Sequence, residues 1–135
     1  MTFSDTLEIS AAGMRVQGDR LRAVAENIAN ADSTASTAGG TPYRRKTITF
    51  QNVLNKQLGV QTVSVAKRGY DNAPFIKKYD PSHPAADAQG YVQYPNVNTI
   101  VEMMDMREAR RGYEANMNVV EVSKAMLTQT LQLLK

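Results

Sequence analysis

The C-terminal run from Met103 to Lys135, MMDMREARRGYEANMNVVEVSKAMLTQTLQLLK, decides the fold of this chain. Stepping through it alternately by three and four residues reaches ten positions, of which eight are apolar. This spacing is typical of the a and d positions of a coiled coil. We therefore expect one long helix over 96–135. Its apolar stripe, interrupted by Arg110 and Lys124, consists of Met103, Met106, Tyr113, Met117, Val120, Leu127, Leu131 and Leu134.

A second helix is predicted at the N-terminus, from about Asp5 to Asn30. Apolar residues recur there every seven positions, with one more between the last two repeats, and the set is Leu7, Met14, Leu21, Val24 and Ile28. At a rise of about 1.5 Å per residue, this helix is about 39 Å long, against about 57 Å for the C-terminal helix. The N-terminal helix is therefore too short to cover the whole C-terminal stripe.

The middle of the chain, residues 34–95, reads as loop and short strands. The run from Ser33 to Thr41 is small and polar, which indicates a loop. Strand-like runs follow at 46–50, 60–66 and 75–79, separated by turn-forming residues. The predicted fold class is therefore mainly α, with long N- and C-terminal helices forming a coiled-coil-like inner layer and a small β-containing middle segment. The corresponding domains are 1–33, 34–95 and 96–135.

The composition excludes several classes of protein. Hydrophobic residues make up 42% and charged residues 21% of the 135 residues, which is not the profile of a disordered chain. No apolar run approaches the roughly 20 residues of a transmembrane helix. There is no cysteine and only one histidine, so thiolate metal sites and a cysteine nucleophile are excluded. No nucleotide-binding glycine motif is present. We predict no catalytic residues, no cofactor and no small-molecule substrate.

Two local features leave alternatives open. His83 lies between Asp80 and Asp87, and these three are competent metal ligands, but a Pro-rich loop does not preorganise them. The segment from Thr41 to Asp80 carries eight basic residues and two acids, interleaved with aromatic rings. That composition would suit single-stranded nucleic acid, although a solvated face over a small β core is the simpler interpretation. A basic nucleic-acid-binding protein is therefore kept as the alternative function.

The length of the C-terminal stripe favours assembly over a self-contained fold. Ordering a helix costs about 1–2 kcal/mol per residue, and only about two residues in seven lie on such a stripe. Burial of each Leu or Met returns about 1.5–3 kcal/mol, provided that another helix covers it. A compact helical bundle remains the alternative, although the sequence offers no third or fourth helix to complete it. We expect neighbouring subunits to cover the stripe.

Long residue strings also carry a resemblance. The runs ISAAGMRVQGDRLRAVAENIANADST at 9–34 and YPNVNTIVEMMDMREARRGYEANMNVV at 94–120 resemble the terminal regions of bacterial flagellar rod and hook axial proteins. The strings PYRRK at 42–46 and DPSHPAADAQGYVQYPNVN at 80–98 narrow the resemblance to the proximal-rod branch of that family. The resemblance covers nearly the whole chain.

The resemblance implies a structural role rather than an enzymatic one. It implies a subunit of a hollow rod that crosses the periplasm, transmits torque and serves as an export channel. The implied partners are other proximal-rod subunits, the adaptor between the MS ring and the export gate, distal-rod subunits and the flagellar type III export apparatus. Export by that apparatus would fit the absence of a cleavable signal peptide in the first residues. Under this hypothesis the apolar stripe residues form the assembly interface, and Phe3 with Leu7 forms an export-recognition element.

Overall fold

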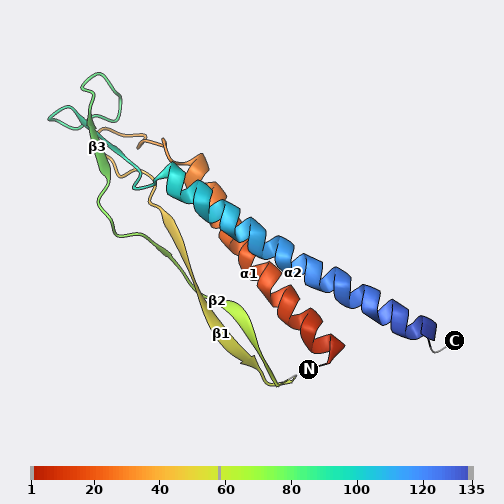
Figure 1. Cartoon of the computed structure of the whole chain (residues 1–135). Coiled ribbons are helices and arrows are strands. Elements are labelled where there is room, and N and C mark those ends of the chain that lie inside the picture. Colours follow the sequence, from red (N-terminus) through yellow and green to blue (C-terminus); the bar gives the residue numbers. More distant parts are fainter. Residues whose placement is uncertain (1, 58, 134–135) are drawn as a thin grey trace. The chain divides into compact units, whose positions relative to one another are not determined.

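The computed structural model describes residues 2–57 and 59–133. Along the chain, one helix comes first, four strands follow it, and a second helix comes last (Figure 1). The elements are α1 (Phe3–Ala29), β1 (Lys46–Asn55), β2 (Val60–Tyr70), β3 (Ile76–Tyr79), β4 (Tyr91–Tyr94) and α2 (Thr99–Leu133). The long helices thus occupy the two ends of the chain, and the strands lie between them.

The prediction of a mainly α fold with a coiled-coil-like inner layer is wrong. Helices hold 47% of the described residues and strands hold 22%, in two small antiparallel sheets, so the fold is mixed. The strand content was underestimated because β1 continues beyond Phe50 to Asn55 and β2 continues beyond Ala66 to Tyr70. In addition, β4 was not anticipated, since its four residues follow a loop rich in Pro and Asp.

Short polar side chains fix where each helix begins. Thr2 precedes α1, and its backbone N–H donates to Asp5 Oδ2 while its Oγ1 accepts from the Asp5 backbone N–H. This reciprocal pair satisfies two of the amide groups that a helix leaves unbonded at its start. At α2, Asn98 Oδ1 accepts from the backbone N–H groups of Ile100 and Val101. Both helices therefore begin at a cap that the sequence encodes locally.

Contacts divide the chain into two compact units. The first unit holds the residues up to Leu21, the segment Ile48–Lys67 and the residues from Arg107 onwards. The second unit holds Arg22–Thr47 and Arg68–Met106. Each unit therefore combines part of α1, part of α2 and one part of the β structure.

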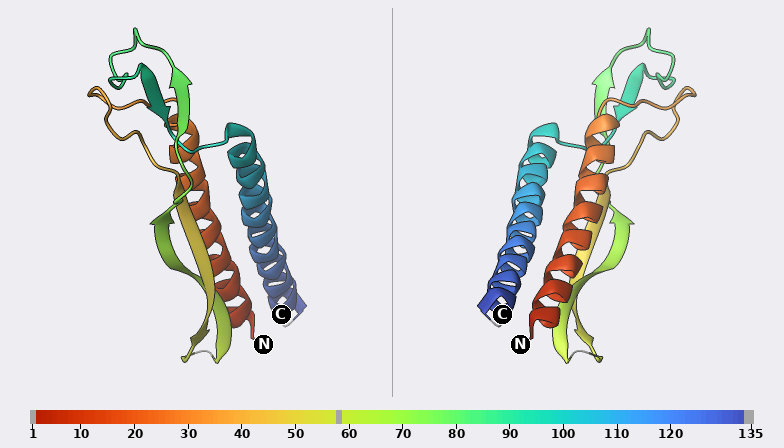
Figure 2. Two further views of the ribbon diagram at one scale, coloured as in Figure 1. Left: turned by 90° about the vertical axis from the view of Figure 1, so that its left-hand side faces the viewer. Right: turned by 90° about the vertical axis from the view of Figure 1, so that its right-hand side faces the viewer.

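In the first unit, α1 lies between the β1–β2 sheet and α2 (Figure 2). Ala12 and Val16 of α1 are buried. They border a shallow cleft whose other wall is formed by residues 62–65 of β2. Because the apolar residues of α1 are divided between the sheet and α2, this helix is covered on two sides.

In the second unit, β3 and β4 form a two-stranded antiparallel sheet in which Ile76 is opposite Tyr94 and Tyr79 is opposite Tyr91. The rings of Tyr79 and Tyr91 meet edge to face with centroids 5.3 Å apart. Gly90 precedes β4 with φ of +84°, and a Cβ at this position would lie 3.0 Å from the Tyr79 ring. Glycine is therefore required there both by backbone conformation and by space.

Candidate assembly surface

The face of α2 that packs against α1 in the first unit is small and polar. Ala109 is fully buried. A Cβ on Gly13 would lie 2.8 Å from Asn116 Nδ2, and one on Gly112 would lie 3.2 Å from Gln17. Gln17 Oε1 is buried and accepts no hydrogen bond from any residue that the structure describes. The two helices therefore approach closely through glycines and amides rather than through large apolar side chains.

Part of the predicted apolar stripe of α2 lies one position away from this inward face. Glu102, Ala109 and Asn116 repeat every seven residues and are buried or half-buried, whereas Met103, Arg110 and Met117 follow each of them and are exposed. Among the other predicted residues, Met106 and Val120 are half-buried. The exposed ones are Tyr113, Leu127 and Leu131, and Leu134 falls outside the described residues.

A second exposed apolar stripe runs along the other side of the inward face. It was not predicted, and it consists of Val101, Met104, Val119, Val122, Met126 and Leu133. At about 100° per residue these positions lie within about 60° of one another around the helix. The inward face of α2 is thus flanked on both sides by large apolar side chains in contact with solvent.

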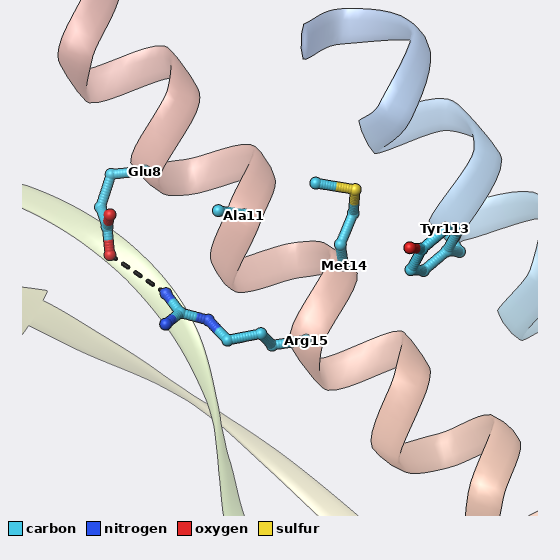
Figure 3. A pocket seen from close by; sticks show the side chains of 5 residues that line it. All are labelled: Glu8, Ala11, Met14, Arg15 and Tyr113. Atoms are coloured by element: carbon cyan, nitrogen blue, oxygen red, sulfur yellow. Dashed lines mark hydrogen bonds and ion pairs between the residues drawn. The ribbon is translucent and has the colours of Figure 1, made fainter.

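The predicted residues of α1 are less exposed than those of α2. Val24 is buried, whereas Leu7, Met14, Leu21 and Ile28 are half-buried. Met14 faces Tyr113 of α2 across a shallow pocket, which Glu8 and Arg15 also line (Figure 3). The structure therefore brings Met14 and Tyr113 together.

Phe3, the other half of the proposed export element, is exposed at the first turn of α1. Leu7 is one turn further along the same helix and is half-buried. The two side chains therefore differ in accessibility in the folded chain.

A buried polar cluster joins α1, the start of β1 and α2 within the second unit. Glu102 is fully buried, and both of its carboxylate oxygens are hydrogen-bonded. Oε1 accepts from Arg45 Nε at 2.5 Å, and Oε2 accepts from Asn27 Nδ2 at 3.0 Å. Asn27 Oδ1 in turn accepts from the Tyr43 hydroxyl and from the Lys46 backbone N–H, each at 2.8 Å. We call these residues, Asn27, Tyr43, Arg45 and Glu102, the polar clasp.

The electrostatics of the polar clasp follow from its burial. Burial raises the pKa of the Tyr43 hydroxyl above its ordinary value. Burial alone would lower the pKa of Arg45, but the hydrogen bond to Glu102 and the charge of that carboxylate outweigh it, so the pKa is raised. Arg45 also lies 3.6 Å from carboxylate oxygens of Asp71 and Asp105. The guanidinium is therefore surrounded by acidic groups.

The basic residues of the middle segment are largely engaged within the second unit. Arg44 stacks over the Phe75 ring at 4.3 Å, Lys46 pairs with Glu26, and Lys78 lies 4.5 Å from the centre of the Tyr94 ring. Side chains that already pack on rings or carboxylates are less available to a phosphate backbone.

The loop around His83 is used for its own turns. His83 Nδ1 accepts from the Ala85 backbone N–H, Asp80 Oδ1 accepts from Ser82, and Asp87 Oδ1 accepts from Gln89 and Tyr91. Within residues 2–57 and 59–133, no three histidine or acidic side chains are arranged to hold a metal ion. Neither described helix has a stretch apolar and long enough to cross a bilayer.

Comparison with known proteins places this architecture in a family. Residues 88–133 match the family model for the C-terminal region of flagellar basal body rod FlgEFG proteins. The flagellar basal-body rod protein FlgC of Agrobacterium fabrum is 50% identical over 133 residues, covering 98% of this chain and 96% of the relative. The chain belongs to the FlgC family of flagellar basal-body rod proteins. The FlgC proteins of Bacillus subtilis and Salmonella typhimurium are each 37% identical over at least 98% of both chains.

The family membership confirms the prediction made from the terminal strings. The chain is a structural subunit of the rod of the flagellar basal body. The relatives are structural proteins, and the alternative of a nucleic-acid-binding protein finds no support among them.

Sequence reasoning missed two features of this surface. The second stripe was overlooked because only one three-and-four register was followed, and testing the neighbouring registers of 99–133 would have found it. Glu102 and Asn27 were overlooked because a single polar residue beside an apolar stripe reads as solvent-facing. Glu102 is bonded to Arg45, 57 residues away in the sequence, and to Asn27, 75 residues away.

Proposed function

We propose that the chain is built into the rod through the two exposed stripes of α2, each of which packs against helices of neighbouring subunits. The observation that carries this proposal is the exposure of large apolar side chains along one helix. Val122, Met126, Leu127 and Leu131 keep between 42% and 63% of their surfaces in solvent. Stripes of this kind on a subunit of a larger structure are typical of protein interfaces.

The energy available is sufficient to drive association. Complete burial of one such side chain stabilises by about 1.5–3 kcal/mol. About half of each surface is already covered, so covering the rest of these four contributes about 1 kcal/mol each, or about 4 kcal/mol in total. That corresponds to roughly a thousandfold in affinity, shared between the two stripes. A subunit held at several such patches is retained firmly.

The partners and route are part of this proposal. The neighbours would be other proximal-rod subunits and, at the ends of the proximal rod, distal-rod subunits and the adaptor between the MS ring and the export gate. The terminal segments 1–33 and 96–135 would carry assembly, and the segment 34–95 would form the β-containing remainder. The chain would reach the periplasm through the flagellar type III export apparatus.

Charged substitutions on the stripe test the proposal. Leu127→Asp and Leu131→Asp each place a carboxylate where a partner helix must pack, at a cost of several kcal/mol. We expect cells that carry either variant as their sole copy to be non-motile and to lack complete rods. Gln132→Asp is the matched control, since this exposed position adds the same charge about 140° around the helix from Leu127 and about 80° or more from every residue of the second stripe.

Immunoblots for the exported chain separate a failure of assembly from a failure of export. The proposal requires that both leucine variants leave the cytoplasm as efficiently as the Gln132→Asp control. Full motility with Leu127→Asp or Leu131→Asp would show that the stripe is not an assembly interface.

A further inference from the structure

The side of α2 that faces inward is not the side that simple burial of apolar surface would choose. The inward face carries Glu102, Ala109 and Asn116, while large apolar stripes run along both of its flanks. Turning α2 by about one residue position, about 100°, in the sense that replaces position 102 by position 101 would bring the second stripe inward, with Val101, Val119 and Met126. Since the hydrophobic effect favours burial of the larger apolar surface, a specific contact must hold the observed face inward.

The polar clasp supplies such a contact in the second unit. Both carboxylate oxygens of Glu102 are bonded, one to Arg45 and the other to Asn27. Asn27 is itself fixed, because its side-chain N–H donates to the Lys46 carbonyl at 2.9 Å and its oxygen accepts from Lys46 and Tyr43. The donors aimed at Glu102 therefore have little freedom to follow the carboxylate elsewhere.

Rotation of α2 would break this match completely. The Glu102 carboxylate would leave its donors, and Val101, whose side chain accepts no hydrogen bond, would face Arg45 and Asn27. Arg45 would keep Asp71 nearby but lose its fully buried partner Glu102, and separating a buried ion pair is costly. A buried polar group can in this way fix a register at some expense of stability.

We infer that Glu102, held by Arg45 and Asn27, is a positioning residue that selects which face of α2 turns inward, and so keeps the apolar flanks free. The consequence reaches along the helix because residues seven positions apart share a face. The inference concerns the facing of α2 in the isolated chain, so it does not depend on which partner covers the flanks.

Cysteine labelling tests the inference directly, since the chain has no cysteine of its own. Single cysteines are introduced at Met103, which is half exposed, and at Ala109, which is fully buried. Reactivity with a maleimide is then measured in the full chain. In the otherwise unchanged chain we expect position 103 to react at least tenfold faster than position 109.

The decisive variant combines Arg45→Met with Glu102→Met. It removes both charges of this ion pair and keeps side chains of similar volume. We expect this variant to remain helical by circular dichroism, while the ratio of the two labelling rates falls by tenfold or more. Arg20→Met with Glu108→Met is the matched control. It removes a more exposed ion pair, between α1 and α2, and the ratio should not change.

Glu102→Gln provides a second measurement in case the Met pair does not fold. It keeps the shape of the side chain but not its charge, and the amide accepts fewer of the hydrogen bonds offered. A fall of about threefold in the labelling ratio is expected. An unchanged ratio in the folded Met pair would overturn the inference, and so would an unchanged ratio in Glu102→Gln if the Met pair is unfolded.

Discussion

Two glycines of α1 allow the close approach of the helices to be measured. Replacing a helical glycine by alanine stabilises a protein by about 1 kcal/mol if the new methyl group meets nothing. Gly18 meets that condition, since apart from its chain neighbours and its own helix backbone nothing lies within 4 Å of the added Cβ. At Gly13, by contrast, the Cβ would lie 2.8–2.9 Å from three atoms of the Asn116 amide. That amide is held by a hydrogen bond from Nδ2 to the Gly112 carbonyl.

The expected outcomes therefore have opposite signs. Gly18→Ala should raise the free energy of unfolding by up to about 1 kcal/mol. Gly13→Ala gains the same propensity but loses about 1–3 kcal/mol to overpacking, so we expect a net loss of about 1 kcal/mol. Urea denaturation followed by circular dichroism resolves this difference, because 1 kcal/mol moves the midpoint by about 0.5 M at an m-value of about 2 kcal/mol/M.

A double variant shows whether the amide is the cause. Asn116→Ala opens space for the new methyl group, so Gly13→Ala with Asn116→Ala should be more stable than the sum of the two single changes implies. If Gly13→Ala is as stable as Gly18→Ala, the helices do not approach as closely as the structure indicates, and the reasoning on the inward face fails with it.

Three further outcomes are expected. Glu102→Ala removes the acceptor that Arg45 and Asn27 share and should destabilise the chain by about 1–3 kcal/mol, measured by urea denaturation, because Arg45 still lies near Asp71 and Asp105. If the export element is correct, replacing Phe3 and Leu7 together by Ala should lower the amount of exported chain in an immunoblot of cell fractions, and unchanged export would remove that hypothesis. The hydrogen bond from the backbone N–H of the cap residue lowers the pKa of Asp5 below its ordinary value of 3.8. Its stabilisation of the first turn is therefore complete above that value and is lost as the pH falls through the lowered pKa, which amide hydrogen exchange with Asp5→Asn as the control would detect.

The parts of the fold that depend on local patterns were accessible from the sequence. The seven-residue spacing from Leu7 to Ile28 predicted a helix that the structure gives as Phe3–Ala29, and the spacing from Met103 onwards predicted one given as Thr99–Leu133. Periodicity over this length is difficult to produce in any other secondary structure. Capping residues then set the beginnings to within a few positions.

The parts that depend on distant contacts were not accessible. The four residues of β4 are too few to carry a pattern, and they form a strand because Ile76–Tyr79 pairs with them. Which face of α2 turns inward is likewise decided by Arg45 and Asn27, which lie on other elements. A periodic pattern shows that a helix has an apolar side. It does not show that a face with a buried carboxylate will pack inward instead of that apolar side.

The uncovered flanks of α2 also affect the chain before it meets any neighbour. Exposed valine, leucine and methionine side chains along one helix promote aggregation when the concentration of unassembled chain is high. Chain that is synthesised faster than it is built into rods is then harmful, so we expect a cell to match its synthesis closely to rod assembly. Overproduced chain should collect in insoluble bodies, and lengthy storage at high concentration should be avoided by anyone who purifies it.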